Sequence, residues 1–298
     1  MSKLKGSRLE AEVDRARTDG NWKRLTELLP AVRSKHSGLE DVYELLLGEV
    51  QLESYLEQQG EILRPNKDHY DKVKGAESQL YTTIREHGKN GSAILEANLL
   101  LSKLHYTCAE YQKSLIDIDN SGMENANTPF RTLRALRLVA EAYAIKGLCL
   151  ETMEVSSRSR SESVGSNTSY EQKALFCFEK SAELAISFIN ELEKTIFSAQ
   201  APKGANVSTS SVTGKPAEKL GEILECCLER VAVLRAKDTI AQKKKMEARG
   251  SNGTGESSPA SATSQPASDC SKSCRDNSQN SSFAPRSPAI GRSARRSA

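Results

Sequence analysis

Apolar side chains recur every three or four positions along most of the first 240 residues. This spacing places them on one face of an α-helix, and no persistent alternation of period two, which is typical of half-buried strands, accompanies it. The pattern therefore predicts an all-α protein. The expected helices lie over about 7–19, 22–32, 40–57 and 70–86, then a hairpin at 98–118, then longer helices at about 129–150, 169–196 and 220–234.

Three polar segments interrupt this pattern. Residues 156–168 (SSRSRSESVGSNT) and 200–214 (QAPKGANVSTSSVTG) have the composition of exposed loops, so we expect them to be insertions between helices. From Gly250 onward Ser, Gly, Pro, Ala and Asn dominate, and Phe283 is the only aromatic residue. Such a segment buries too little apolar surface to offset its ordering entropy. We predict a helical domain over residues 1–249 and a disordered C-terminal tail over 250–298.

Helix pairs of similar length indicate an internal repeat. In a tetratricopeptide unit a small residue on the first helix lets the second helix approach closely. The second helix then carries a small residue, usually Ala, followed four positions later by an aromatic or aliphatic residue. Three partial matches stand in this sequence: Gly48 with Ala76 and Leu80; Ser102 with Ser114 and Ile118, across a turn at Ala109 and Tyr111; and Gly147, on one stripe with Tyr143, with Ala174 and Phe178.

The spacings within these units support the repeat. Ser102 precedes Ser114 by 12 positions, whereas Gly147 precedes Ala174 by 27, and the excess of 15 matches the polar segment 156–168. Gly48 precedes Ala76 by 28, across a segment that contains Gly60 and Pro65. The sequence thus favours a right-handed α-solenoid of degenerate tetratricopeptide-like hairpins with loop insertions. The alternative is an irregular helical bundle in which the matches are accidental.

Composition and charge narrow the classes of function. The chain has 298 residues, and no apolar run is long enough to cross a bilayer, so we predict no transmembrane segment. The net charge of +3 belongs to the tail, where six Lys and Arg face three Asp and Glu. The balanced remainder lacks the basic surface that nucleic-acid binding needs. The seven cysteines are scattered and follow no export signal, which predicts reduced thiols.

Motifs that carry chemistry are missing from the sequence. The four histidines stand apart from one another and from the cysteines, and no zinc-binding spacing or phosphate-binding glycine loop occurs. We therefore predict no cofactor, no metal and no catalytic residue. Lys243, Lys244 and Lys245, with the arginines of the tail, are candidates for contact with anionic lipid, but a solvated charged segment is the preferred interpretation.

Five segments resemble the N-terminal part of the tetratricopeptide repeat protein 7 family. They are GSRLEAE (6–12), GNWKRL (20–25), ELLLGE (44–49), RTLRALRLVAEAYAIKGLCLE (131–151) and LGEILECCLERVAVLRAKD (220–238). The block from Leu138 to Glu151 is the most specific, and the resemblance runs from about Lys5 to Asp238. The resemblance implies a non-catalytic scaffold of the type III alpha phosphatidylinositol 4-kinase. In that family the scaffold, hyccin and a lipid-anchored peripheral protein hold the kinase catalytic subunit at the plasma membrane.

The sequence departs from the family pattern after Asp238. TIAQKKKMEARG follows without an Ala-x3-aromatic anchor, which is typical of an alternative or truncated end. In the family the C-terminal repeats hold hyccin, so that partner is in doubt. We also expect Leu224, Val231 and Leu234 to lack a capping repeat.

Two other functions remain open at this point. A chaperone adaptor that grips a C-terminal carboxylate carries Asn after the small residue of the first helix, and here Lys103 and Leu148 stand there. A lipid kinase in its own right would need phosphate-handling motifs. Both are less favoured than a cytoplasmic scaffold that its partners recruit to the membrane.

Overall fold

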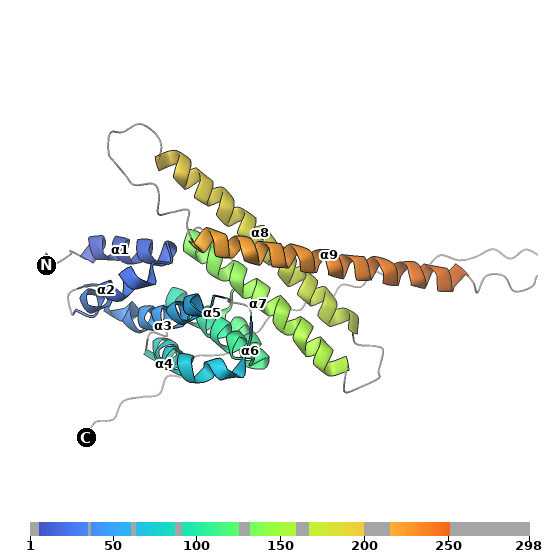
Figure 1. Ribbon diagram of the computed structural model, residues 1–298, viewed down its shortest axis with the longest axis horizontal. Coiled ribbons are helices and arrows are strands. Elements are labelled where there is room, and N and C mark those ends of the chain that lie inside the picture. The colour runs from blue at the N-terminus through green and yellow to red at the C-terminus, as the bar shows by residue number, and fades with distance from the viewer. Residues whose placement is uncertain are drawn as a thin grey trace, which may run out of the picture. The chain divides into compact units, whose positions relative to one another are not determined.

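The computed structural model describes residues 6–34, 37–60, 64–86, 91–124, 132–158, 167–199 and 215–250. Within these ranges it contains helices and no strand, and helices adjacent in sequence pack as neighbours, which confirms the prediction of an all-α solenoid (Figure 1). The α-helices are α1 (Gly6–Thr18), α2 (Trp22–Val32), α3 (Tyr43–Gln59), α4 (Tyr70–Glu86), α5 (Gly91–Thr107), α6 (Tyr111–Ser121), α7 (Leu133–Arg158), α8 (Asn167–Ala199) and α9 (Lys215–Gly250). Short 3-10 turns precede α3 and α4, at Glu40–Val42 and Lys67–His69.

Local chemistry explains two of the sharp turns. Gly20 has a φ of 62°, and the N–H of Asn21 donates to the carbonyl of Ala16, which ends α1. Asn21 then caps α2, because its side chain accepts from the N–H of Arg24. Ala109 has a φ of 59° at the end of α5, a left-handed conformation that costs a residue with a Cβ about 1 kcal/mol or more.

The long helices α7, α8 and α9 extend beyond the ranges that the sequence predicted. We expected an insertion over 156–168, but α7 continues to Arg158 and α8 begins at Asn167. Extending an existing helix adds one hydrogen bond for each residue that becomes ordered. Polar residues that follow a long helix can therefore continue it. The expected insertion at 200–214 and the expected tail from residue 251 onward lie outside the described residues.

The helices α3, α5 and α7 form an inner row of the helical domain. Each hairpin pairs one odd with one even helix, and α3 packs on α5, α5 on α7 and α7 on α9. The helix α1 also contacts α7. In α5 every residue from Ala97 to Thr107 is buried, so this helix is enclosed on all sides.

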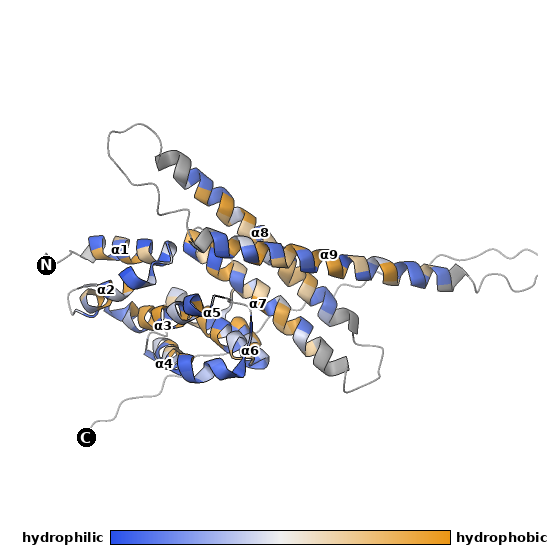
Figure 2. Ribbon diagram, viewed as in Figure 1, coloured by the Kyte–Doolittle hydropathy of each residue, from blue (hydrophilic) through white to orange (hydrophobic). Residues whose placement is uncertain are grey.

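The even-numbered helices and α9 keep one polar side. Apolar and polar residues alternate along α7, α8 and α9, as Figure 2 shows. Leu220, Ile223, Cys227 and Leu234 form the buried side of α9, against α8 and α7. Leu234 is buried, because the register of α9 turns it toward α8 and α7. The expected lack of a capping repeat beyond α9 stays a prediction. Leu224 and Val231 are partly buried against that core.

Candidate functional site

Two glycines permit the closest helix contacts within hairpins. A Cβ on Gly48 of α3 would lie 2.9 Å from Leu80 Cγ and 3.2 Å from the carbonyl oxygen of Ala76, both on α4. A Cβ on Gly147 of α7 would lie 2.6 to 2.9 Å from three ring carbons of Phe178 on α8. Real Cβ atoms do not approach that closely, so both positions exclude a side chain at the present helix separation.

In the middle hairpin, Ser102 of α5 occupies the position equivalent to Gly48 and Gly147, and Ser114 of α6 faces it. Ser114 Oγ of α6 donates a hydrogen bond of 2.8 Å to the backbone carbonyl of Ser102 in α5. The Cys149 thiol of α7 lies 3.7 Å from the same Ser114 oxygen, which brings the next hairpin into this contact. Ser181 of α8 makes a similar bond of 2.7 Å to the carbonyl of Ala140 in α7. Small hydroxyl side chains thus tie neighbouring helices through backbone carbonyls.

The remaining residues predicted from the repeat are spread over the same interfaces. Ala109 forms the turn after α5, and Tyr111 begins α6 with its ring centroid 5.9 Å from that of Tyr106. Ile118, Tyr143 and Ala174 are buried. The structure therefore distributes the predicted residues over three separate hairpins and does not gather them into one site.

A cluster of four charged residues joins the odd-numbered helices α1, α3, α5 and α7. Arg17 of α1 donates from Nε to Glu49 of α3 at 2.7 Å and from Nη2 to Glu96 of α5. Arg134 of α7 reaches the same two carboxylates, at 2.7 Å from Glu49 Oε1 and 3.1 Å from Glu96 Oε2. The two positive and two negative charges balance.

A second cluster lies about one to two helical turns further along α3, α5 and α7. Lys103 of α5 has a side chain only 2% exposed, and it donates to Glu53 of α3 at 2.6 Å and to Glu141 of α7 at 2.9 Å. Arg137 of α7 lies 3.8 Å from Glu141. This cluster is also neutral in sum. A buried charge without its partner is costly, so we expect the two clusters to favour this register of the helices over others.

The pKa directions agree with ionised partners in both clusters. Burial alone would raise the pKa values of Glu53 and Glu96, but the positive charges beside them hold both below the usual range. Burial alone would lower the pKa of Lys103, and Glu141 and Glu53 raise it instead. Arg134 is the exception: burial and the like charge of Arg17 lower its pKa.

A buried histidine connects α4, α5 and α6. His105 Nδ1 lies 2.5 Å from Asp117 of α6, and Nε2 lies 3.0 Å from Glu77 of α4. Two carboxylate acceptors require a donor at each ring nitrogen, which is the imidazolium form. Burial lowers the pKa of His105, but the hydrogen bonds to Asp117 and Glu77 outweigh it and raise the pKa above the ordinary value.

The sequence analysis did not find these buried charges. Glu77 lies between the apolar residues Val73 and Leu80 of α4, and it is the carboxylate that meets His105. Glu49 and Glu53, four positions apart and next to Val50 and Leu52, were a sequence signal of buried charge. Charged residues on a face that apolar residues otherwise occupy indicate a buried pair, provided that a partner of opposite sign sits at the same depth on a neighbouring helix.

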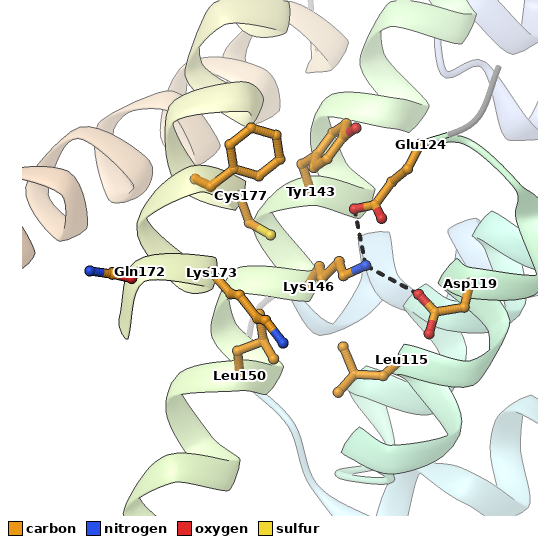
Figure 3. Close-up of a pocket in the computed structure, with 10 residues that line it drawn as sticks. Leu115, Asp119, Glu124, Tyr143, Lys146, Leu150, Gln172, Lys173 and Cys177 are labelled. Carbon is orange, nitrogen blue, oxygen red and sulfur yellow. Dashed lines mark hydrogen bonds and ion pairs between the residues drawn. The ribbon is translucent and has the colours of Figure 1, made fainter. Parts of the chain in front are cut away.

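A groove opens between α6 and α8, with α7 as its floor (Figure 3). Lys146 of α7 crosses it and donates to Asp119 at 3.1 Å and to Glu124 at 3.0 Å. Apolar and charged side chains both line the groove: Leu115, Asp119, Glu124, Tyr143, Lys146, Leu150, Gln172, Lys173, Phe176 and Cys177. The helices α6 and α8 do not pack against each other as α5 and α7 do, and the groove lies in the space between them.

Four buried cysteines, Cys108, Cys149, Cys177 and Cys227, are poor nucleophiles. Burial raises the pKa of Cys149 and of Cys177 to about 12, and that of Cys108 and of Cys227 to about 11. A thiol reacts as its thiolate, so these side chains serve packing. No group of three His, Cys, Asp or Glu in the described part of the chain is placed to hold a metal ion. Among the described helices none is both long and apolar enough to cross a membrane.

Packed helix pairs with small residues at their contacts define a helical-repeat protein of the tetratricopeptide type. The family model for the tetratricopeptide repeat protein 7 N-terminal region matches residues 1–248, and the chain belongs to this family. The match continues past Asp238, where we expected the family pattern to end.

Named relatives agree with this assignment. The chain is 34% identical to human tetratricopeptide repeat protein 7B over 249 residues, which cover 80% of this chain and 27% of the relative. It is 34% identical to the mouse 7B protein over 248 residues, covering 78% of this chain and 27% of the relative, and 29% identical to human 7A over 210 residues, covering 63% and 24%. The matched region thus spans about a quarter of the length of these relatives.

Proposed function

We propose that this protein is a non-catalytic scaffold that helps to assemble the type III alpha phosphatidylinositol 4-kinase and to localise it at the plasma membrane. Membership of the tetratricopeptide repeat protein 7 family, over residues 1–248, is the observation that carries the proposal. The fold is compatible with it, because stacked hairpins present a long surface to partner proteins. The high thiol pKa values of the buried cysteines fit a binding role better than a catalytic one.

The proposed partners are the kinase catalytic subunit and a lipid-anchored peripheral membrane protein. Hyccin is a weaker candidate, because the family resemblance assigns its contact to later repeats and the matched region spans about a quarter of the relatives. The protein would reach the plasma membrane through these partners.

The buried charges argue against a chaperone adaptor. Such an adaptor needs open polar side chains on the odd-numbered helices to grip a carboxylate. Here Lys103 follows the small residue Ser102, and its ammonium group is buried between Glu53 and Glu141. A peptide carboxylate would have to displace both of these ion pairs.

Capture from cells tests the proposed scaffold. The tagged full-length chain, expressed in human cells, should recover the type III alpha kinase and the lipid-anchored protein on affinity beads. Gly147→Leu should lose most of this recovery, because the added side chain meets Phe178. Gly221→Leu is the matched control, since nothing lies within 4 Å of a Cβ at Gly221. Absence of the kinase from captures with the unaltered chain would overturn the proposal.

A further inference from the structure

The groove between α6 and α8 has the form of a binding site for a short peptide. Its volume of about 710 Å³ falls within the range of ligand sites. Leu115, Tyr143 and Leu150 line its interior. Phe176 of α8 also lines it and remains 50% exposed. Covering a half-exposed apolar side chain with another apolar side chain is favourable, because it removes apolar surface from water.

The two sides of the groove carry opposite charge. Asp119 lies in the last turn of α6 and Glu124 follows that helix, whereas Lys173 comes from α8 on the other side (Figure 3). Lys146 approaches one oxygen of each carboxylate, Oδ1 of Asp119 and Oε1 of Glu124. One ammonium group shared by two carboxylates leaves an excess negative charge on this side. It also leaves a second oxygen on each carboxylate as an acceptor for an added donor.

The exposure of these groups favours a ligand over a closed structural contact. The side chains of Asp119 and Glu124 are 68% and 43% exposed, while the Lys146 side chain between them is only 15% exposed. The lysine is therefore held in place and the carboxylates are open. A guanidinium is the group that best matches two neighbouring carboxylates, because its donors form a planar fork.

We infer that this groove binds a short peptide segment of a partner protein that carries an arginine beside a bulky apolar residue. The arginine pairs with Asp119 and Glu124, and the apolar side chain covers Phe176. An acidic residue on the far side of the apolar one meets Lys173. The inference goes beyond the proposed scaffold role, because the groove takes such a peptide whichever assembly the protein joins.

Selection from random peptides tests the inference without a known ligand. A phage library of random 12-residue peptides is panned on the immobilised full-length chain, and bound phage are sequenced. We expect enrichment of arginine within a few positions of Leu, Ile or Phe. Failure to enrich any sequence, or enrichment of sequences without that pairing, would overturn the inference.

Variants then locate the selected peptide, with affinity measured by fluorescence anisotropy. Asp119→Asn with Glu124→Gln should weaken binding about tenfold or more, as expected for the loss of hydrogen bonds to charged acceptors. The matched control is Asp71→Asn with Glu191→Gln, two exposed carboxylates that each pair with a lysine elsewhere. It should change the affinity less than about twofold.

The apolar contact has its own matched pair on one helix. Phe176 and Ile186 of α8 are 50% and 49% exposed, and only Phe176 lines the groove. Phe176→Ala should weaken the peptide about tenfold, in line with the burial of a large apolar side chain, and Ile186→Ala should not. Both residues are half exposed, so neither change should prevent folding, which circular dichroism checks. Equal binding to the unaltered chain and to the Phe176 and carboxylate variants would refute the site.

Discussion

At the scale of single residues, close packing depends on positions where a side chain is missing or minimal. Gly147 and Phe178 show this most clearly, because the Phe178 ring occupies the space that a Cβ on Gly147 would take. Phe178 is fully buried, so its ring has little room to move away. Protein interiors are packed as densely as organic crystals, so one additional methyl group at such a point lowers stability.

Gly147→Ala should destabilise the protein by about 1 to 2 kcal/mol. Overpacking destabilises by about 1 to 3 kcal/mol, and the higher helix propensity of Ala offsets about 0.5 to 1 kcal/mol of that destabilisation. Gly221→Ala on α9 meets nothing within 4 Å and should leave stability unchanged or slightly higher. Urea unfolding followed by circular dichroism measures both, and equal effects of the two changes would contradict this account.

His105 links protonation to stability at the same scale. Its raised pKa means that the folded protein holds the imidazolium proton more tightly than the unfolded chain does. The stabilisation is fully present below the unfolded value of about 6.5. It is lost as the pH rises through the higher pKa of the folded state.

The unaltered chain should therefore exceed His105→Gln in stability by more at pH 6 than at pH 8.5. Urea midpoints of both proteins at several pH values measure this difference. The control substitution is His69→Gln, since His69 is hydrogen-bonded to the Tyr55 hydroxyl and not to a carboxylate through that nitrogen. A His105 effect that stays constant or grows as the pH rises would show that His105 is neutral in the fold.

At the scale of helices, buried ion pairs determine how the hairpins stack. The inner helices α3, α5 and α7 meet through Lys103, Glu53 and Glu141 as well as through apolar contacts. Apolar faces alone permit several registers, whereas a buried charge without its partner is costly in every register but one. The clusters thus select one arrangement of the hairpins.

Lys103→Met should destabilise the protein by about 3 to 5 kcal/mol, because Glu53 and Glu141 would stay buried without a counter-charge. Lys146→Met is the matched control, since Lys146 also joins two carboxylates, but their side chains are 68% and 43% exposed. Its cost should be about 1 kcal/mol or less. Denaturant unfolding of the two variants separates the cases, and similar losses would mean that burial does not matter here.

At the scale of the whole molecule, the contribution of α9 ends before the helix does. Leu220, Ile223, Cys227 and Leu234 are buried, whereas the side chains from Arg235 to Glu247 are exposed. The contacts beyond Leu234 are surface ion pairs such as Arg235 with Glu179, which add little to stability.

A chain shortened to residues 1–238 should therefore keep the thermal unfolding midpoint of the full chain. A chain shortened to residues 1–219 should have a free energy of unfolding several kcal/mol lower, since burial of Leu220, Ile223 and Leu234 contributes about 1.5 to 3 kcal/mol each. Differential scanning calorimetry on the three proteins tests this. A lower midpoint for residues 1–238 would assign a stabilising role to the end of α9.

The sequence by itself determined the helices, because helix formation and amphipathic faces depend on neighbours three and four positions away. It placed α2 and α4 at Trp22–Val32 and Tyr70–Glu86, and it singled out Gly48, Ser102 and Gly147, which the structure puts at helix contacts. The sequence alone also showed the family resemblance over most of the chain, which the family model confirms.

Only the tertiary structure decided which charges are buried and where a groove remains. Lys103 and its two carboxylates are 50 and 38 positions apart, and Arg17 and Glu96 are 79 apart. Their meeting depends on the stacking of whole helices, which no local pattern specifies. The opening between α6 and α8 likewise follows from how far apart two helices lie, and that distance is set by the side chains of α7 between them.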